Sequence, residues 1–169
     1  EAETKTAIDA ANAAQPAWAA KTPKERAKLL RDLFNIMMAN QQDLARILTL
    51  EQGKPLTEAA GEIAYGANYI EWFAEEAKRI HGEVLAPPTG DKRVVVIRQP
   101  VGVAALITPW NFPNAMLTRK IAPALAAGCT VVCKPASETP LSALAIAELC
   151  DRVGIPTGVV NIVCGNTRA

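Results

Sequence analysis

The 169-residue chain has little that would point to a nucleic acid, a membrane or a metal. Only 5% of its residues are aromatic and it has one histidine. Eighteen basic residues face 17 acidic ones, without a basic stripe that would suit a nucleic acid. Charges and prolines interrupt every apolar stretch well before the roughly 20 residues that a bilayer requires. We therefore expect a globular protein that binds neither nucleic acid nor a membrane.

The four cysteines, at positions 129, 133, 150 and 164, do not have the spacing of a zinc site, and His81 lies far from them. None has a neighbouring histidine or a cationic turn that would lower its pKa and make it a nucleophile. We interpret all four as small buried residues in a reducing compartment, and we expect no metal site and a cytoplasmic protein. The chain starts without methionine, so we expect a segment of a longer protein, from which a transit sequence could have been lost.

Residues 1–83 have the pattern of a helical unit. Thr22-Pro23-Lys24-Glu25 is a capping box with proline at the first helical position, and it predicts a helix start. The helix continues with apolar residues at helical spacing: Leu30, Leu33, Phe34 and Met37. Gly53 and Pro55 end this helical stretch and begin the next.

A second long helix is predicted over residues 56–80, with Gly82 as its end. Gly61 and Gly66 lie inside it and lower its intrinsic stability. We therefore expect both glycines to permit close packing against another element.

Residues 84–100 are predicted to form a β-hairpin. Residues 86–91 contain two prolines and a Gly-Asp pair, which favour a turn, and Arg93 and Arg98 flank a run of β-branched residues. A short strand with basic residues at both ends suits a sheet edge or an interface between subunits.

Residues 101–169 alternate between strand and helix patterns. Strands are predicted at 102–107, 129–134 and 159–164, and helices at 114–127 and 140–153, with Gly128 and Gly154 at the helix ends. Such alternation favours a parallel sheet with helical crossovers. The predicted fold class is α/β, with N-terminal helices, a β-hairpin and then a βαβαβ half of an open parallel nucleotide-binding sheet.

The first of these strands ends in Thr108-Pro109-Trp110-Asn111-Phe112-Pro113, where a common dinucleotide-binding sheet has a glycine-rich G-x-G-x-x-G turn. Without those glycines the backbone cannot approach a pyrophosphate as closely. Any dinucleotide must therefore lie differently across the strand ends.

The string from Leu106 to Met116 resembles the aldehyde dehydrogenase superfamily, whose members carry P-W-N-F-P at this place. The segment from Lys134 to Pro140 has the same family's K-P-x-x-x-T-P pattern. The resemblance covers nearly all of the chain, and residues 50–55 and 69–74 look like the succinate-semialdehyde dehydrogenases in particular.

The resemblance implies a binding site for NAD or NADP. Its residues would be Thr108, Pro109, Trp110, Asn111, Lys134, Pro135, Ala136, Ser137 and Gly165. The family's lysine contacts the adenosine ribose, and a carboxylate often follows three positions later in NAD users. Ser137 stands there in this chain, which resembles members that accept NADP, so NADP is favoured; alternatively, Ser137 only faces water.

The resemblance also implies two catalytic residues and one substrate-binding residue. Asn111 would donate its amide to the oxyanion of the thiohemiacetal, and Lys120 would take part in proton transfer. Arg119 stands in a T-R-K string typical of enzymes that oxidise succinate semialdehyde, where the arginine pairs with the substrate carboxylate. Taken alone, an asparagine on a turn also suits an Asx turn, and a helix arginine is commonly exposed.

Family members are much longer and hold the nucleophilic cysteine, the general-base glutamate and an F-T-G-S turn in later segments. We therefore expect residues 1–169 to be inactive alone, while the parent enzyme, a homo-oligomer joined through the hairpin region, oxidises succinate semialdehyde to succinate. The alternatives are another semialdehyde acid, a neutral aldehyde, or a non-catalytic nucleotide-binding module.

Overall fold

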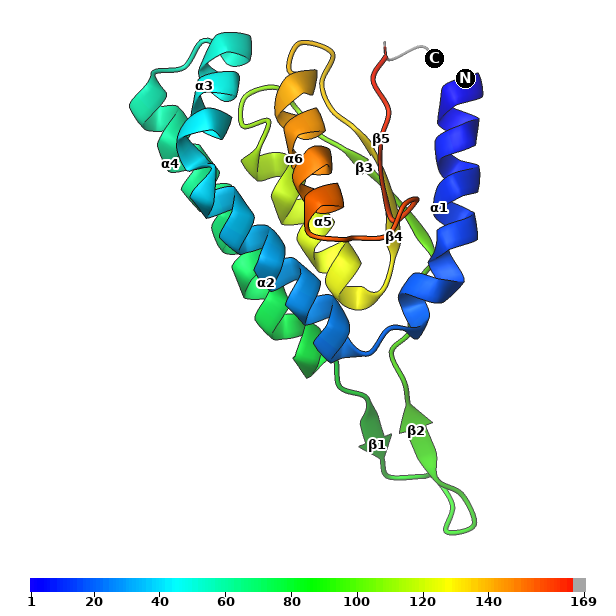
Figure 1. Cartoon of the computed structure of the whole chain (residues 1–169). Coiled ribbons are helices and arrows are strands. Elements are labelled where there is room, and N and C mark those ends of the chain that lie inside the picture. Colours follow the sequence, from blue (N-terminus) through cyan, green and yellow to red (C-terminus); the bar gives the residue numbers. More distant parts are fainter. Residues whose placement is uncertain (166–169) are drawn as a thin grey trace.

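The computed structural model describes residues 1–165 and confirms the predicted α/β class (Figure 1). Its helices are α1 (Ala2–Ala20), α2 (Pro23–Ala39), α3 (Gln41–Gln52), α4 (Leu56–Glu76), α5 (Ala115–Ala127) and α6 (Pro140–Arg152). Its strands are β1 (Glu83–Leu85), β2 (Val94–Val96), β3 (Val103–Ile107), β4 (Thr130–Lys134) and β5 (Val160–Ile162). The last four residues of the predicted third segment, 166–169, lie outside the described residues. No helix in the described part is long and apolar enough to cross a membrane.

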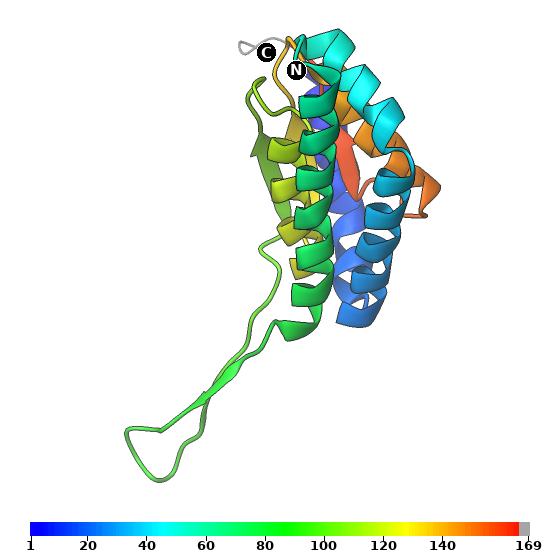
Figure 2. The same ribbon diagram turned by 90° about the vertical axis from the view of Figure 1, so that its left-hand side faces the viewer.

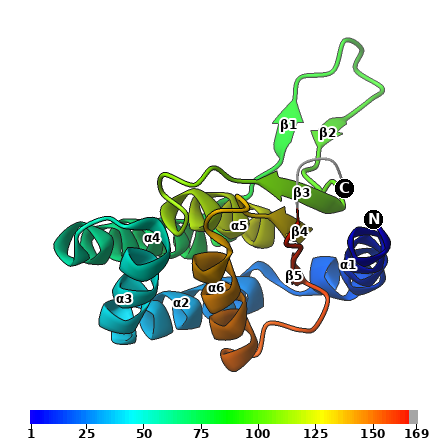
Figure 3. The ribbon, with the colours of Figure 1, turned by 90° about the horizontal axis from the view of Figure 1, so that it is seen from above.

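Strands β3, β4 and β5 form a parallel sheet in that order, with Val103 opposite Thr130 and Val131 opposite Val160. Helices α5 and α6 connect them and cover one face of the sheet, whereas α1 lies on the opposite face (Figure 3). The strands are parallel, so their carboxyl ends meet at one edge. The predicted βαβαβ unit is thereby confirmed, with β5 shorter than expected.

Helix α1 is fixed to the sheet by Gln15. Its side chain donates to Gly128 O (3.0 Å) and accepts from Thr130 N (2.8 Å), and Trp18 is buried nearby in the core. These contacts satisfy backbone groups at the start of β4 that the sheet leaves free.

Helices α2, α4 and α5 pack together beside the sheet (Figure 1). The predicted apolar face of α2 is confirmed, because Leu30, Leu33 and Met37 are fully buried and Phe34 is half-buried. The capping box at Thr22 and Glu25 is also present.

The prediction for the two glycines of α4 is right for one and wrong for the other. A Cβ on Gly66 would lie 2.5 Å from Asn114 Oδ1, so this glycine permits close contact with α5. A Cβ on Gly61 would meet no atom within 4 Å, because Gly61 lies on the exposed side of the helix.

Helix α4 ends at Glu76 and continues as a 3₁₀ turn over Ala77–Arg79, so the predicted end at residue 80 is too late. Ala77 is the last buried residue of this helical segment, whereas Ile80 is exposed. Without a core contact, the last predicted turn gains no tertiary stabilisation as a helix.

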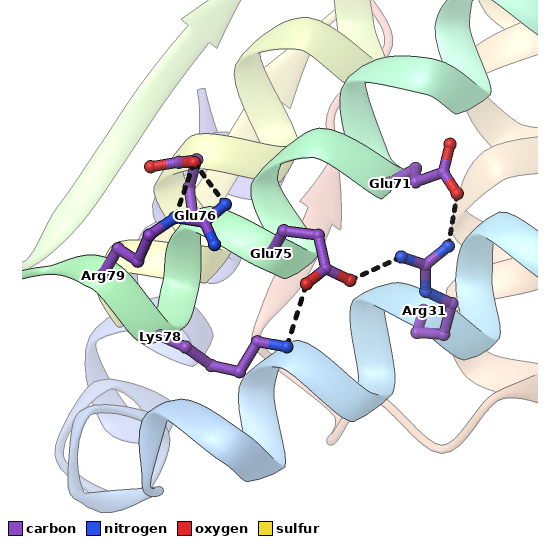
Figure 4. A network of polar contacts seen from close by, with 6 residues as sticks. All are labelled: Arg31, Glu71, Glu75, Glu76, Lys78 and Arg79. Carbon is purple, nitrogen blue, oxygen red and sulfur yellow. Dashed lines mark hydrogen bonds and ion pairs between the residues drawn. The ribbon is translucent and has the colours of Figure 1, made fainter.

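Ion pairs link α2 to α4 on the outer surface (Figure 4). Arg31 donates to Glu71 (2.5 Å) and to Glu75 (2.6 Å), and Lys78 donates to Glu75 (3.0 Å). These hydrogen bonds from Lys78 and Arg31 hold the pKa of Glu75 below its usual value. Each exposed pair stabilises the fold only modestly, but Arg31 joins two helices.

The hairpin projects away from the helices and the sheet (Figure 2). Strand β1 pairs antiparallel with β2, Glu83 opposite Val96, and the paired part is shorter than the predicted strand over residues 93–98. Its apolar side chains Val84, Val95 and Ile97 are exposed.

Three of the cysteines are buried as predicted, but Cys164 is exposed. It follows the end of β5, and the described chain does not cover it. Burial raises the pKa of Cys133 and of Cys150 to about 12, so both are held as neutral thiols.

Candidate active site

The carboxyl edge of the sheet brings together the predicted cofactor residues that lie at the ends of three strands. Thr108 N donates to Lys134 O (3.2 Å), which joins the ends of β3 and β4. Ser137 Oγ donates to Gly165 O (2.9 Å), which joins the segment after β4 to the one after β5. Pro135 is buried, and Ala136 lies half-buried beside it.

A hollow of about 580 Å³ opens at this edge, between the strand ends and the start of α1. Lys134 and Gly165 line it, together with apolar side chains that include Ile107 and Val163. Thr108 is buried, and its hydroxyl finds no hydrogen-bond partner among residues 1–165. The edge therefore combines an apolar wall with a lysine and an unsatisfied hydroxyl.

The segment between β3 and α5, residues 108–114, is called the site turn below. Pro109, Trp110 and Asn111 are exposed on it. Its last residue, Asn114, is buried beneath α4. Asn111 is thus exposed on a turn whose far end is packed into the core.

Arg119 is exposed on α5, and its guanidinium lies 5.2 Å from the ring centroid of Tyr69 on α4. Nη1 of Arg119 also lies 3.6 Å from the sulfur of Met116. A hydrogen bond between the hydroxyls of Tyr69 and Tyr65 raises the pKa of Tyr69, with desolvation adding to the effect and Arg119 opposing it. The guanidinium is held on an aromatic surface and has no carboxylate partner among the described residues.

Lys120 points in another direction from Arg119. Its Nζ donates to Ile107 O (2.5 Å), the last carbonyl of β3. The ammonium group therefore lies at the strand end, next to the site turn, and its predicted part in proton transfer stays a prediction.

Sequence reasoning missed two charged residues under the site turn, Lys54 and Glu62. Glu62 is almost fully buried and contacts the backbone of residues 114 and 115, and Lys54 contacts Asn111 O. A signal for Glu62 existed, because it falls at the helical spacing of the core positions Ala59, Ile63 and Gly66. A carboxylate at such a position requires buried partners.

The sequence that forms this fold and site matches one known protein family. The family model described as the aldehyde dehydrogenase family matches residues 1–169, and the chain belongs to that family. The predicted resemblance is therefore confirmed.

Two curated relatives differ in their named substrates. The chain is 65% identical over 167 residues to the NADP(+) succinate-semialdehyde dehydrogenase GabD of Escherichia coli strain K12, covering 99% of this chain and 35% of that protein. It is 63% identical over 165 residues to a glutarate-semialdehyde dehydrogenase of Pseudomonas aeruginosa, covering 98% of this chain and 34% of that protein. The chain thus spans about a third of the length of these relatives.

A solved structure shows the same arrangement. The crystal structure of succinate-semialdehyde dehydrogenase from Burkholderia pseudomallei superposes with a TM-score of 0.98 at 59% identity, covering 99% of this chain and 35% of that one. At this similarity the fold of the segment is that of the corresponding part of an aldehyde dehydrogenase.

Proposed function

We propose that the parent protein oxidises succinate semialdehyde to succinate with NADP or NAD, and that NADP is preferred. The substrate assignment rests on Arg119, whose exposed guanidinium lies over the ring of Tyr69. Arg119 stands on α5, the helix that follows the turn bearing Asn111. A guanidinium binds a carboxylate through two parallel hydrogen bonds. An aldehyde with a carboxylate at its far end can therefore be held by Arg119 while its reacting end lies near Asn111.

Glutarate semialdehyde is the second candidate, because a relative named for it is almost as similar as the one named for succinate semialdehyde. Both compounds carry a terminal carboxylate, and they differ by one methylene group. Arg119 would bind either carboxylate, so discrimination between them depends on the distance to the reacting carbon.

The strand edge fits a nicotinamide dinucleotide. The buried hydroxyl of Thr108 has no hydrogen-bond partner among residues 1–165, and Lys134 ends the neighbouring strand, with Ser137 three residues after it. Lys134 would bind the adenosine ribose, and Ser137 would leave room for a 2′-phosphate. Pro109 and Trp110 would line the border of the cofactor site. When bound, the cofactor accepts the hydride from the substrate carbon. The NADP in the name of the Escherichia coli relative supports the preference.

The chain's own residues would orient and stabilise the reacting groups. Asn111 would donate its side-chain N–H to the oxyanion that develops on the aldehyde oxygen, which contributes about 3 kcal/mol in comparable sites. Arg119 would fix the substrate, which raises the rate by limiting its orientations. The nucleophile would come from the remaining part of the protein, so residues 1–169 alone are proposed to be inactive.

The test is steady-state kinetics of the full-length parent with succinate semialdehyde, glutarate semialdehyde and a neutral aldehyde such as propanal. Arg119→Ala is expected to lower kcat/KM for the acidic substrates about 10- to 100-fold and to leave that for propanal nearly unchanged. Arg46→Ala, which removes an exposed arginine of α3, is the control. An equal loss on acidic and neutral substrates would contradict the substrate assignment. Cofactor binding without turnover of any aldehyde would favour the non-catalytic alternative.

We also propose that the parent is a cytoplasmic homo-oligomer. The exposed apolar residues Val84, Val95 and Ile97 of the projecting hairpin support contact between copies. Light scattering of the full-length protein, with Val95→Glu as the variant, tests the assembly.

A further inference from the structure

A buried ion pair lies under the site turn. Lys54 Nζ and Glu62 Oε2 are 2.5 Å apart, and the exposed fractions of the two side chains are 11% and 1%. Lys54 follows the end of α3, and Glu62 lies in the second turn of α4. Neither residue belongs to the βαβαβ unit that carries the site.

Glu62 fixes the far end of the site turn. Its Oε1 accepts hydrogen bonds from Asn114 N (2.9 Å) and Ala115 N (3.1 Å), the backbone groups at the start of α5. The first N–H groups of a helix have no partner within the helix, so a carboxylate there stabilises the helix start. One carboxylate thus holds both the lysine and the turn.

Lys54 fixes the middle of the same turn. Its Nζ donates to the backbone carbonyl of Asn111 (3.1 Å) and lies 4.4 Å from the centroid of the Phe112 ring. The carbonyl belongs to Asn111, the exposed residue whose side chain is proposed to meet the oxyanion. A restraint on this carbonyl limits the backbone rotation that would turn the Asn111 side chain away.

Stability alone is a weak reason for such a pair. Desolvation of two charges often cancels their attraction, and apolar residues of similar size commonly serve as well. Here the two charged groups also form hydrogen bonds with backbone atoms of the site turn and of the first residue of α5.

We propose that Lys54 and Glu62 are positioning residues that aim the amide of Asn111 at the developing oxyanion. The proposal rests on the proposed function, which gives Asn111 that task. Lys54 holds the site turn at its middle residue and Glu62 holds it where α5 begins, and the ammonium–carboxylate contact makes them one unit.

The chain offers a matched control in Glu51. Its carboxylate accepts from Leu141 N (2.6 Å) and Ser142 N (2.8 Å) at the start of α6, so it caps a helix as Glu62 does. Its hydrogen bonds go to α6, and none goes to the site turn. Glu51→Gln therefore weakens a helix start without touching Asn111.

The experiment compares full-length Lys54→Met, Glu62→Gln, Lys54→Arg and Glu51→Gln with the unchanged enzyme. Lys54→Met and Glu62→Gln are expected to lower kcat about 10- to 100-fold on both succinate semialdehyde and propanal, with the KM for NADP changed less than about threefold. Lys54→Arg, which keeps the charge and the donors, is expected to recover most of kcat. Glu51→Gln is expected to lower Tm about as much as Glu62→Gln does, while its kcat stays within about twofold of that of the unchanged enzyme. A kcat of Lys54→Met and Glu62→Gln no lower than that of Glu51→Gln would overturn the proposal.

Two further measurements separate this proposal from the proposed function. Asn111→Ala tests the role of Asn111: if it leaves kcat unchanged, the proposed function of Asn111 fails. The crystal structure of full-length Lys54→Met, or of the milder Glu62→Gln if the first does not fold, tests positioning without any assay. Displacement or disorder of the Asn111 side chain supports the proposal, and an unchanged Asn111 overturns it.

Discussion

Gly66 and Asn114 touch where α4 crosses the start of α5, and no side chain fits between them. A Cβ on Gly66 would come 2.5 Å from Asn114 Oδ1 and 3.3 Å from the Cα of Ala115. The close approach of these two helices brings Glu62 of α4 within reach of the site turn.

Gly66→Ala is therefore expected to destabilise the protein, by about 1–3 kcal/mol, because the buried side chain of Asn114 has to move out of the way and α5 is crowded behind it. Gly61→Ala in the same helix is expected to stabilise it by about 0.5–1 kcal/mol, since the new methyl group meets open space and alanine favours the helix. Denaturant unfolding of the two variants and the unchanged protein measures both changes. Equal effects of the two substitutions would contradict the packing described.

Tyr69→Leu is expected to raise the KM for acidic aldehydes. The ring supports the Arg119 guanidinium at 5.2 Å, and at an exposed site such a contact is worth about 0.5–1 kcal/mol, or about two- to fivefold. Tyr69→Phe keeps the ring and removes only the hydroxyl bonded to Tyr65, so it is the control and is expected to keep KM nearly unchanged. If both variants raise KM equally, the hydroxyl rather than the ring supports the site.

Ser137→Glu is expected to shift the cofactor preference from NADP toward NAD. A carboxylate at this position would repel a 2′-phosphate, so kcat/KM with NADP should fall about tenfold or more while that with NAD changes little. Ser137→Ala removes the hydrogen bond to Gly165 O without adding charge and separates the two effects. An equal loss with both cofactors would place the adenosine end elsewhere.

Cys133 and Cys150 are expected to resist alkylation in the folded protein. Their pKa values are raised to about 12, mainly by desolvation, and the thiolate is the reactive form. At pH 8, four units below this pKa, only about one thiol in ten thousand is ionised, and labelling should increase as pH rises. Mass spectrometry after iodoacetamide treatment measures the labelling, with guanidinium-unfolded protein as the positive control. Rapid labelling of either residue at pH 8 in the folded state would contradict the described burial.

Local patterns predicted most of the fold, because each depends on neighbours in the sequence. The helical spacing of Leu30, Leu33 and Met37 placed the core face of α2, and the Pro-Trp-Asn turn placed the end of β3. The contacts beneath the site could not be predicted in this way. Lys54 meets a carbonyl 57 residues later, and Glu62 meets backbone groups 52 and 53 residues later. The ring of Tyr69 under Arg119 likewise depends on how α4 crosses α5.

The carboxylates of Glu51 and Glu62 have a consequence for how a nucleotide can bind. The N-terminal end of a helix carries a partial positive charge and free N–H groups, and many nucleotide-binding folds use it for phosphate. At the starts of α5 and α6, the N–H groups of residues 114, 115, 141 and 142 already donate to these carboxylates. A phosphate at either helix end would have to displace an anion that belongs to the chain. A dinucleotide bound at this sheet edge, as proposed, would then have its diphosphate neutralised away from both helix starts.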